Sequence, residues 1–342
     1  MEEVRLALMG FGNVGRALAQ MILDKRAAVY SRYGKRLIVT AIATGSHGNL
    51  YNPKGIDLKQ ALQHYEEGGF TEEEDADWTE DSADTLVYCG EYDVLVELSP
   101  LNIQTGQPAA NRIKQALKMK KSAVSANKGP VAWYYSDLAA MAQARGGKFF
   151  FESTVMDGTP IFNLKDECLK LCEVTEIEGI LNSTTNFILK ALEEGKSWDQ
   201  ALEEGRALGF VEADPSMDTD GWDAAAKICV LSNVLMGAGI DPRSVRRQGI
   251  AGITREQIEE AKARGKVIKL MCRAVRDEFG RVSASVAPEE IDADSLYAGI
   301  DGASSVVRIT TDLMGTLTLV EHDPTIVQTA YGVFQDILRL FS

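Results

Sequence analysis

Residues 4–23 read VRLALMGFGNVGRALAQMIL, and this segment sets the architecture of the N-terminal half. Its first six residues form an apolar run of strand length, and residues 16–23 have helical character. Between them, Gly10, Gly12 and Gly15 spell G-x-G-x-x-G. The first glycine permits a tight turn, the second lets the backbone approach a pyrophosphate, and the third lets the helix pack close to the strand. A strand, this turn and a helix predict a dinucleotide site, with the helix N-terminus facing the phosphates.

Strand-like and helix-like segments alternate from this turn to residue 150. We expect strands at residues 37–43, 93–98, 122–125 and 148–152, and helices at residues 105–119 and 131–145. This βαβ alternation predicts an α/β fold with a Rossmann-type doubly wound parallel sheet, and so a dinucleotide-binding domain over residues 1–150. The acidic run at residues 72–75 is expected to be a solvated loop or a helix end.

The second half of the chain has a different pattern. We expect helices at residues 184–194, 198–208, 222–236 and 254–264, strands at residues 174–181, 267–275, 281–287, 304–311 and 316–321, and a closing helix at residues 324–340. Runs of helices followed by runs of strands predict a second, α+β domain that binds the substrate, over residues 151–303.

Composition restricts the classes of function. A chain of 342 residues with 45% hydrophobic and 25% charged residues is typical of a globular protein with room for two domains. The net charge of -14 argues against a nucleic-acid or anionic membrane partner, and the longest apolar runs are too short to span a bilayer. The N-terminus does not resemble a signal peptide. Five cysteines without C-x-x-C spacing are best explained as reduced thiols in a cytoplasmic protein: Cys89, Cys168, Cys172, Cys229 and Cys272.

Residues 212–227, EADPSMDTDGWDAAAK, form an acidic loop that runs into a helix. Asp223 and Lys227 are four residues apart and therefore share a helix face. Lys227 lies within an otherwise apolar run, and desolvation of an ammonium lowers the pKa of a lysine, which suits acid and base catalysis. The carboxylates before it suit a ligand that carries an amino group. A solvated loop with a structural Asp–Lys pair is the alternative interpretation.

Three further turns carry candidate site residues. In SANKGP, residues 125–130, Lys128 follows a strand and so belongs near the carboxyl ends of the sheet, where open α/β folds bind ligands; an exposed loop lysine is the alternative. ESTVMDGTP, residues 152–160, offers backbone carbonyls to a cation or is only a helix start capped by Thr159. GILNSTTN, residues 179–186, offers small polar donors to a substrate or serves capping alone.

The type of nicotinamide cofactor depends on the end of the second strand. NAD-selective folds tend to place an acid there to hold the ribose diol. Here the strand continues into TGSHG, residues 44–48, without a carboxylate. Ser46 and His47 suit a 2′-phosphate better than an acid does, which favours NADP and leaves NAD possible. An ordinary turn without selectivity is the alternative.

Taken together, these motifs resemble homoserine dehydrogenase. GFGNVG, SANKGP, ESTVMDGTPI, GILNSTTNFIL and GFVEADPSMDTDGWDAAAK occur in that family's order and extend from residue 7 to residue 227. The resemblance implies the reversible NAD(P)-dependent reduction of L-aspartate 4-semialdehyde to L-homoserine, on the way to threonine and methionine. It also implies a homodimer, formed through the second domain. The chain after about residue 304 is expected to return to the nucleotide domain.

The resemblance assigns roles to individual residues. Lys128 and Lys227 match the two active-site lysines, Asp223 the catalytic aspartate, and Glu212 and Asp218 the carboxylates that hold homoserine. Asn182 and Thr184 are further expected at the substrate. The residues expected at the cofactor are Gly10, Gly12, Asn13, Val14, Gly15, Ser46, His47, Ser99, Asn127 and Lys128. A sodium site is expected from the carboxylate of Glu152 and the backbone oxygens of Val155, Asp157 and Thr159.

The sequence departs from the family pattern at two turns. Ser183 replaces the glycine of the usual N-G-T-T-N turn, which affects how closely backbone approaches the substrate. Met156 and Asp157 stand where the sodium turn usually has small residues. Because the chain stops soon after its final helix, we expect a short form without a C-terminal regulatory domain, and so no inhibition by threonine.

The mechanism expected from these residue types is hydride transfer to the aldehyde carbon while a lysine ammonium protonates the developing alkoxide. Lys227, oriented by Asp223, is the favoured proton donor, and Lys128 stabilises the oxyanion or the substrate carboxylate; the reverse assignment stays open. The alternatives are a dehydrogenase of another small hydroxy or amino acid and a non-enzymatic dinucleotide-sensing protein. An acylating aldehyde dehydrogenase requires a reactive cysteine in a polar, basic setting, and no cysteine here has one.

Overall fold

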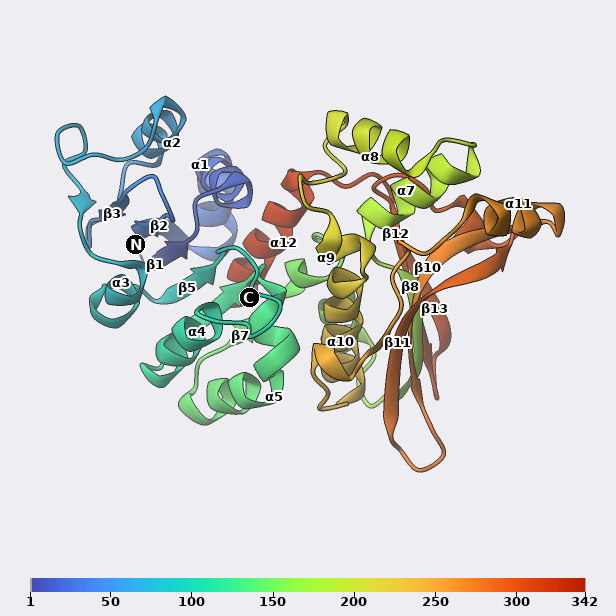
Figure 1. The fold of residues 1–342 in the computed structure, drawn as a ribbon. Helices are drawn as coiled ribbons and strands as arrows, with labels where there is room; N and C mark the ends of the chain where they lie inside the picture. Colours follow the sequence, from blue (N-terminus) through green and yellow to red (C-terminus); the bar gives the residue numbers. More distant parts are fainter. Residues whose placement is uncertain (1, 342) are drawn as a thin grey trace. The chain divides into compact units, whose positions relative to one another are not determined.

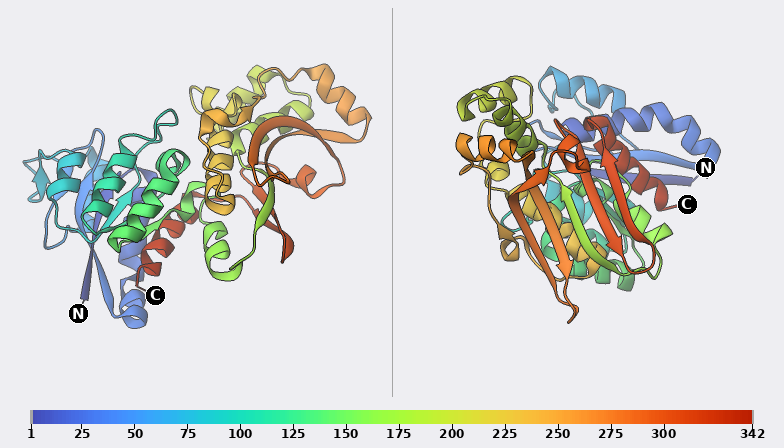
Figure 2. Two further views of the ribbon diagram at one scale, coloured as in Figure 1. Left: turned by 90° about the horizontal axis from the view of Figure 1, so that it is seen from below. Right: turned by 90° about the vertical axis from the view of Figure 1, so that its right-hand side faces the viewer.

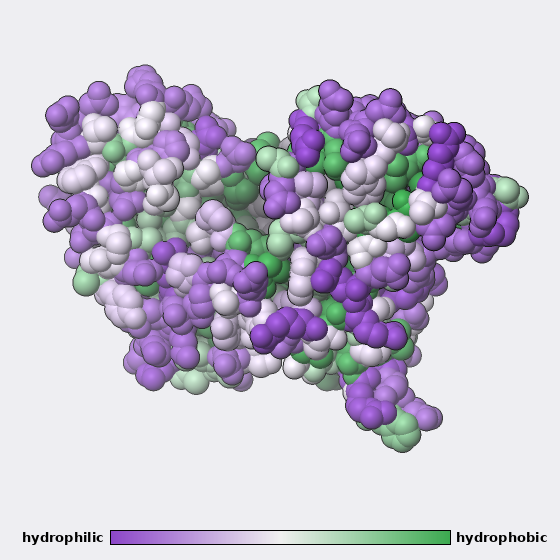
Figure 3. Space-filling model, in the orientation of Figure 1, coloured by the Kyte–Doolittle hydropathy of each residue, from purple (hydrophilic) through white to green (hydrophobic). Residues whose placement is uncertain are grey.

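The computed structural model describes residues 2–341, which divide into two compact units (Figure 1). The first unit contains the chain up to Pro160 and the C-terminal segment from Thr325, and the second unit contains Ile161–Pro324. Within the described range, no helix is both long and apolar enough to cross a membrane. The face drawn in Figure 3 is mostly hydrophilic, in keeping with the acidic composition.

The first unit is built on a seven-stranded sheet with the order β4-β3-β2-β1-β5-β6-β7. The strands are β1 (Glu2–Met9), β2 (Lys35–Ala43), β3 (Asn49–Tyr51), β4 (Trp78–Thr79), β5 (Val94–Glu97), β6 (Ser122–Ser125) and β7 (Phe149–Phe150). Strands β2, β1, β5, β6 and β7 are parallel, and β3 and β4 extend the sheet in antiparallel fashion. The strand order reverses between β1 and β5, and ligands bind at such a switch point, beyond the carboxyl ends of the strands.

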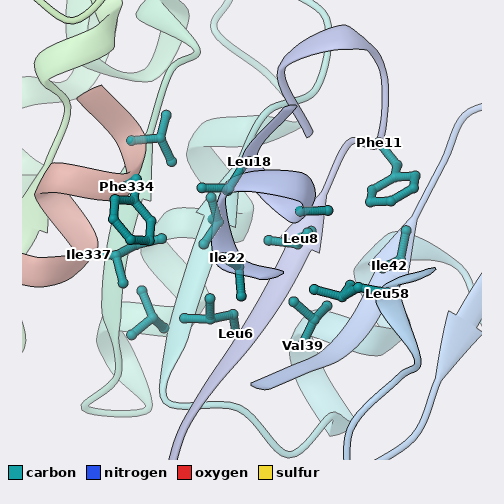
Figure 4. Packing of buried hydrophobic residues seen from close by; sticks show 14 of the residues in the cluster. Leu6, Leu8, Phe11, Leu18, Ile22, Val39, Ile42, Leu58, Phe334 and Ile337 are labelled. Carbon is teal, nitrogen blue, oxygen red and sulfur yellow. The ribbon is translucent and has the colours of Figure 1, made fainter. Parts of the chain in front are cut away.

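Helices cover this sheet on both faces. They are α1 (Asn13–Tyr33), α2 (Leu58–Glu67), α3 (Ala83–Cys89), α4 (Ala109–Lys118), α5 (Lys128–Arg145), the short 3-10 helix η1 (Glu152–Thr154) and α12 (Ile326–Arg339). Helices α1 and α12 share one apolar core with the strands, which includes Leu8, Leu18 and Ile42, and Phe334 and Ile337 from α12 (Figure 4). Burial of this face is what ties the C-terminal helix to the first unit.

The second unit is built on a six-stranded sheet with the order β13-β12-β8-β10-β11-β9. The strands are β8 (Val174–Ile180), β9 (Arg246–Arg247), β10 (Lys266–Arg276), β11 (Val282–Asp292), β12 (Ser305–Thr311) and β13 (Gly315–Glu321). The helices are α6 (Ile161–Cys168), α7 (Ser183–Glu193), α8 (Trp198–Ala207), α9 (Ser216–Thr219), α10 (Trp222–Met236), η2 (Pro242–Ser244), α11 (Arg255–Ala263) and η3 (Leu296–Gly299). Helix α10 packs on β8, β10 and β11 through residues that are small or aliphatic, including Ala224, Ala225 and Ile228.

Two expectations from the sequence need correction. The return to the first unit was expected near residue 304, but it comes at Thr325, because β12 pairs with β8 and buries Val306 and Val307 in the second sheet. The acidic run was expected to be a solvated loop or a helix end; residues 72–74 are exposed in a turn, but Asp75 is buried. Its carboxylate lies 2.8 Å from His64 Nδ1 and accepts from the backbone N–H of Thr71, so it has partners that offset its desolvation.

Candidate active site

The glycine turn follows β1 and has the geometry that close approach of backbone requires. Gly10 has φ of +119°, and a Cβ there would lie 2.5 Å from the carbonyl oxygen of Leu98. A Cβ at Gly15 would lie 2.6 Å from the carbonyl oxygen of Gly10. Gly12, the N-cap residue of α1, has open space around its Cβ position and carries no capping side chain. The N-terminus of α1 is therefore open to an anionic group such as a pyrophosphate.

Beside this turn, the residues expected to select the cofactor lie in an aromatic and polar group. The Ser46 hydroxyl lies 2.9 Å from His47 Nδ1, and the His47 ring stacks on Tyr65 with centroids 4.5 Å apart. Arg16 lies 5.0 Å from the same Tyr65 ring and donates to Asn13 Oδ1 at 2.8 Å. Val14 is half-buried and packs against the core of the first unit.

The carboxyl ends of β5 and β6 bring together a second group of expected residues. Asn127 Nδ2 donates to the carbonyl oxygen of Ser99 at 3.0 Å, and Asn127 Oδ1 accepts from the backbone N–H of Gly129 at 3.0 Å. Asn127 is thus the N-cap of α5, and Lys128 is the first residue of that helix and is half-buried. Lys128 lies at the expected edge of the sheet, but on a helix and not in a loop. Ser99 in turn donates its N–H to the buried carboxylate of Glu97 at 2.8 Å.

In the second unit, four expected residues form one hydrogen-bonded cluster at the start of α7 and α10. Asn182 Nδ2 donates to Asp218 Oδ1 at 2.6 Å and to Asp223 Oδ2 at 2.9 Å. Lys227 Nζ lies 3.3 Å from Asp223 Oδ2 and donates to the carbonyl oxygen of Leu181 at 2.6 Å. The side chains of Lys227 and Asp223 are only 18% and 15% exposed, so their charges are poorly screened by water.

The electrostatics of this cluster favour a ligand that carries a positive charge. Two carboxylates face one ammonium, which leaves an excess of one negative charge when all three are ionised. Burial raises the pKa of Asp218, and the charge of Asp223 raises it further. The hydrogen bond from Asn182 and the charge of Lys227 act in the opposite direction. A ligand ammonium beside Asp218 relieves the repulsion between the two carboxylates.

The other two residues expected at the substrate, Thr184 and Glu212, lie in different surroundings. The Thr184 hydroxyl is buried and donates to the carbonyl oxygen of Phe210 at 2.8 Å, so it ties α7 to the loop that follows α8. Glu212 lies on that loop with its side chain exposed. Among the described residues, it makes no hydrogen bond or ion pair with the cluster around Asn182. The geometry therefore supports Asp218 more directly than Glu212 as a partner for a ligand.

The turn expected to bind sodium belongs to the first unit and packs on α12. The backbone N–H of Glu152 donates to Asp336 Oδ2 at 2.8 Å, and the Thr329 hydroxyl donates to Asp157 Oδ1 at 2.5 Å. Glu152 and Val155 are buried, and Asp157 and Thr159 are half-buried. A buried carboxylate beside backbone oxygens is a donor set that suits a hard cation. Asp157 fits the turn with φ of +42° and directs its carboxylate to α12.

Comparison with known proteins identifies the family. The model described as homoserine dehydrogenase, NAD binding domain, matches residues 10–152, and the model described as homoserine dehydrogenase matches residues 160–338. The chain belongs to the homoserine dehydrogenase family. The second match begins at residue 160, next to the start of the second unit at Ile161, which lies ten residues after the boundary expected from the sequence.

Members of the family from distant organisms match over nearly the whole chain. The NAD(+)-dependent homoserine dehydrogenase of Pseudomonas canavaninivorans is 32% identical to this chain. The match covers 99% of this chain and 97% of that protein. The homoserine dehydrogenase of Methanocaldococcus jannaschii is 33% identical, with 98% of each chain covered. Among solved structures, a hyperthermophilic archaeal homoserine dehydrogenase in complex with NADPH has a TM-score of 0.83 and 31% identity, with 99% of this chain and 97% of that chain covered.

Membership of the family confirms the main expectations from the sequence. The Rossmann-type domain and the second sheet domain are confirmed, and the chain is an oxidoreductase that uses NAD(P). Its reaction is the interconversion of aspartate 4-semialdehyde and homoserine. The pathways to threonine and methionine follow from that reaction.

Two residues of the site were missed by the sequence analysis. Arg16 directly follows the third glycine, so a basic residue in the first turn of the phosphate-facing helix was a signal that was available. Glu97 ends an apolar strand, and an acid at that place indicates a buried polar contact at the cofactor edge. Neither signal by itself assigns the residue to the cofactor site, because the loops that surround it come from other parts of the chain.

Proposed function

We propose that homoserine dehydrogenase chemistry in this chain is carried out by the cluster of Asn182, Asp218, Asp223 and Lys227. The observation that supports this proposal is one amide that bridges two carboxylates, 2.6 Å and 2.9 Å away, beside an ammonium 3.3 Å from one of them. The second unit is the substrate domain, and the first unit is the dinucleotide domain.

Asp218 receives the ammonium of the amino-acid substrate, and Glu212 assists from its loop. The excess negative charge of the cluster supplies the attraction. Asn182 bridges the two carboxylates by donating to both, which reduces the repulsion between them. Thr184 supports this arrangement because its hydroxyl donates to the carbonyl oxygen of Phe210 and so fixes the loop after α8.

Lys227 serves as the proton donor. When bound, NADPH supplies the hydride that reduces the aldehyde carbon. The ammonium of Lys227 protonates the oxygen as negative charge develops on it, and the neutral amine then takes a proton from water. Asp223 orients the amine and stabilises its charged form. Lys128, at the cofactor edge of the first unit, binds the substrate carboxylate or the oxyanion.

The decisive assay is NADP-linked and NAD-linked oxidation of L-homoserine, with L-serine and L-threonine as control substrates. We expect Lys227→Ala to lower kcat by about 10²–10⁴-fold while the Kd for NADPH is unchanged. Lys227→Arg does not restore turnover, because a guanidinium keeps its proton. The matched control is Lys190→Ala on α7, which removes a half-exposed ammonium paired with Glu193 and Asp301. Turnover near the wild-type value in Lys227→Ala contradicts the proposal.

We further propose a preference for NADP over NAD. The segment after β2 contains no carboxylate, and Ser46, His47 and Arg16 supply polar and basic groups around Tyr65. The test is His47→Asp, which adds the acid that holds a ribose diol in NAD-selective folds. We expect the ratio of kcat/KM for NADPH to that for NADH to fall by about tenfold or more, as a 2′-phosphate now faces a like charge. An unchanged ratio contradicts this assignment.

We also propose that the turn at residues 152–159 binds Na⁺ through the Glu152 carboxylate and the backbone oxygens of Val155, Asp157 and Thr159. The buried carboxylate of Glu152 supports this site, since carboxylate and backbone oxygens are the ligands that a hard cation prefers. The test compares melting temperature and activity in sodium and in choline chloride. Glu152→Gln is expected to remove any advantage of sodium, and equal behaviour of the wild type in both salts contradicts the proposal.

The second unit is proposed as the site of homodimer formation. One face of its sheet is covered by α10, and the right-hand view of Figure 2 shows the strands of the other face. At one end of the sheet, Leu171, Leu313 and Met314 are 93%, 71% and 59% exposed, and such apolar patches mark interfaces. Analytical ultracentrifugation tests this: we expect the mass of two chains for the wild type and dissociation at micromolar concentration for Leu313→Asp. A cytoplasmic location is proposed because none of the five cysteines forms a disulfide within residues 2–341.

A further inference from the structure

Glu97 is a buried acid at the cofactor edge of the first sheet that has no assigned role. It is the last residue of β5 and is 0% exposed. Its Oε1 accepts from the backbone N–H of Ser99 at 2.8 Å and from the Ser99 hydroxyl. Its Oε2 is buried and makes no hydrogen bond within residues 2–341. Burial of a carboxyl with one unsatisfied oxygen costs folding free energy, so packing alone does not account for this residue.

Hydrogen bonds connect Glu97 to both parts of the proposed cofactor site. Next to Glu97, Ser99 and Pro100 offer their carbonyl oxygens to Asn127 Nδ2, at 3.0 Å and 3.4 Å. Asn127 caps α5, the helix that begins with Lys128. On the other side, the backbone of Ser99 lies against the glycine turn, since a Cβ at Gly10 would lie 2.9 Å from the Ser99 nitrogen.

We propose that Glu97 is a positioning residue that fixes the Ser99 backbone between the glycine turn and the turn at Asn127 and Lys128. The proposal rests on the function proposed above and on the expectation from the sequence that both turns contact NADP(H). Glu97 acts through the position of its acceptor oxygen: two donors of Ser99 converge on Oε1, and no cation lies within ion-pair distance of the carboxylate among the described residues. Burial raises the pKa of Glu97, which favours the neutral carboxyl and agrees with a role that does not depend on its charge.

Two conservative variants separate the reach of the side chain from its charge. Glu97→Gln keeps an acceptor oxygen at the same distance and removes the acid, whereas Glu97→Asp keeps the acid and withdraws the acceptor by one methylene. We expect the Kd for NADPH, measured by nucleotide fluorescence, to stay within about twofold in Glu97→Gln and to rise about tenfold in Glu97→Asp. The KM for homoserine changes little in either. The opposite order, or an unchanged Kd in both variants, overturns the proposal.

A buried hydrogen bond elsewhere in the same unit provides the control for loss of stability. Tyr92 is buried and donates its hydroxyl to the carbonyl oxygen of Val87 at 2.8 Å. Tyr92→Phe is expected to lower the melting temperature without changing the Kd for NADPH. If it weakens NADPH binding as much as Glu97→Asp, general loosening of the unit explains the effect and the proposal fails.

A double variant of Glu97 and Lys128 tests whether Glu97 affects NADPH binding through the turn at Asn127 and Lys128. We expect Glu97→Asp and Lys128→Ala to raise the Kd for NADPH by less together than the product of their separate effects, because both act on one turn. Full additivity overturns the connection to that turn. The readouts that decide the proposal, the Kd for NADPH and the melting temperature, need no turnover. They therefore stay decisive even if homoserine oxidation survives Lys227→Ala and the proposed catalytic assignment fails.

Discussion

At Asn182 a single side chain meets two carboxylates and a helix terminus. Its amide nitrogen donates to Asp218 and Asp223, and its amide oxygen accepts from the N–H of Thr185 at 2.9 Å. The same group therefore reduces the repulsion between two acids and caps α7. Although the sequence suggested direct contact of Asn182 with the substrate, both amide hydrogens already have carboxylate acceptors. Its contribution in the proposed site is to hold the two carboxylates in place.

We expect Asn182→Ala to lower the free energy of unfolding by about 1–3 kcal/mol, through loss of the cap and of the shared donor. The KM for homoserine should rise more than the Kd for NADPH, because the damage is confined to the second unit. The control is Ser197→Ala, which removes the N-cap and capping box of α8 in the same unit. That control should lose about 1 kcal/mol and keep its KM. A normal KM for homoserine in Asn182→Ala contradicts the bridging role.

Asp218 carries a second prediction at the same scale, which concerns pH. Burial, with the charge of Asp223, raises the pKa of Asp218 in the folded state above its unfolded value. The folded state therefore binds this proton more tightly, and stability falls as pH rises from the unfolded pKa through the folded one. Above the folded pKa the full destabilisation is present.

Asp218→Asn removes that ionisation while keeping an acceptor for Asn182. We expect its melting temperature at pH 8 to exceed that of the wild type by on the order of 1–3 °C, and the difference to shrink as pH falls through the raised pKa. Homoserine oxidation should be strongly reduced at the same time. Differential scanning calorimetry across pH measures the first effect. A constant difference at every pH speaks against ionisation of Asp218 as its cause.

Among the elements, α12 has a role that its place at the end of the chain does not suggest. It returns to the first unit, packs on α1, and holds the turn at residues 152–159 through Thr329 and Asp336. Gly332 makes this contact possible. A Cβ there would lie 2.2 Å from the Ser153 hydroxyl and 2.8 Å from the Cα of Gly158. The helix and the turn are therefore in backbone contact.

We expect Gly332→Ala to lower the free energy of unfolding by about 1–3 kcal/mol, as overpacking does in other cores. In an open helix the same change would stabilise by up to about 1 kcal/mol, so the sign itself is diagnostic. Adding Ser153→Ala should not restore stability, because the backbone of Gly158 remains in the way. Val327→Ala, at a residue that is 55% exposed on the same helix, is the control. A higher melting temperature for Gly332→Ala would show that α12 can move off the turn.

At the scale of the whole molecule, the charge balance affects stability. Fifty acidic residues against 36 basic ones give a net charge of -14, and self-repulsion of this kind opposes the compact state. Choline chloride at about 0.2 M should raise the melting temperature over that at about 0.01 M by on the order of 2 °C, because salt screens the repulsion. If the proposed cation turn is occupied, sodium chloride adds a further increase that Glu152→Gln removes. No response to either salt contradicts the first expectation.

Local patterns were enough to identify much of this protein. The glycine turn and the Asp223–Lys227 pair depend on residues within one turn of each other, and their geometry follows from the periodicity of a strand or a helix. Helix α10 covers residues 222–236, as expected, because its apolar run and its flanking glycines are local signals. The order of the family motifs then led to the reaction.

Only the tertiary structure shows the contacts between segments that are distant in sequence. Asn182 reaches acids 36 and 41 residues away, and Glu97 is linked to α5 through a neighbouring loop. The residues at 305–321 join the second sheet while α12 joins the first core. Periodicity shows which face of a segment is apolar, but not which other segment buries it. That choice depends on the packing of the whole core, where strands and helices remote in sequence compete for the same partners.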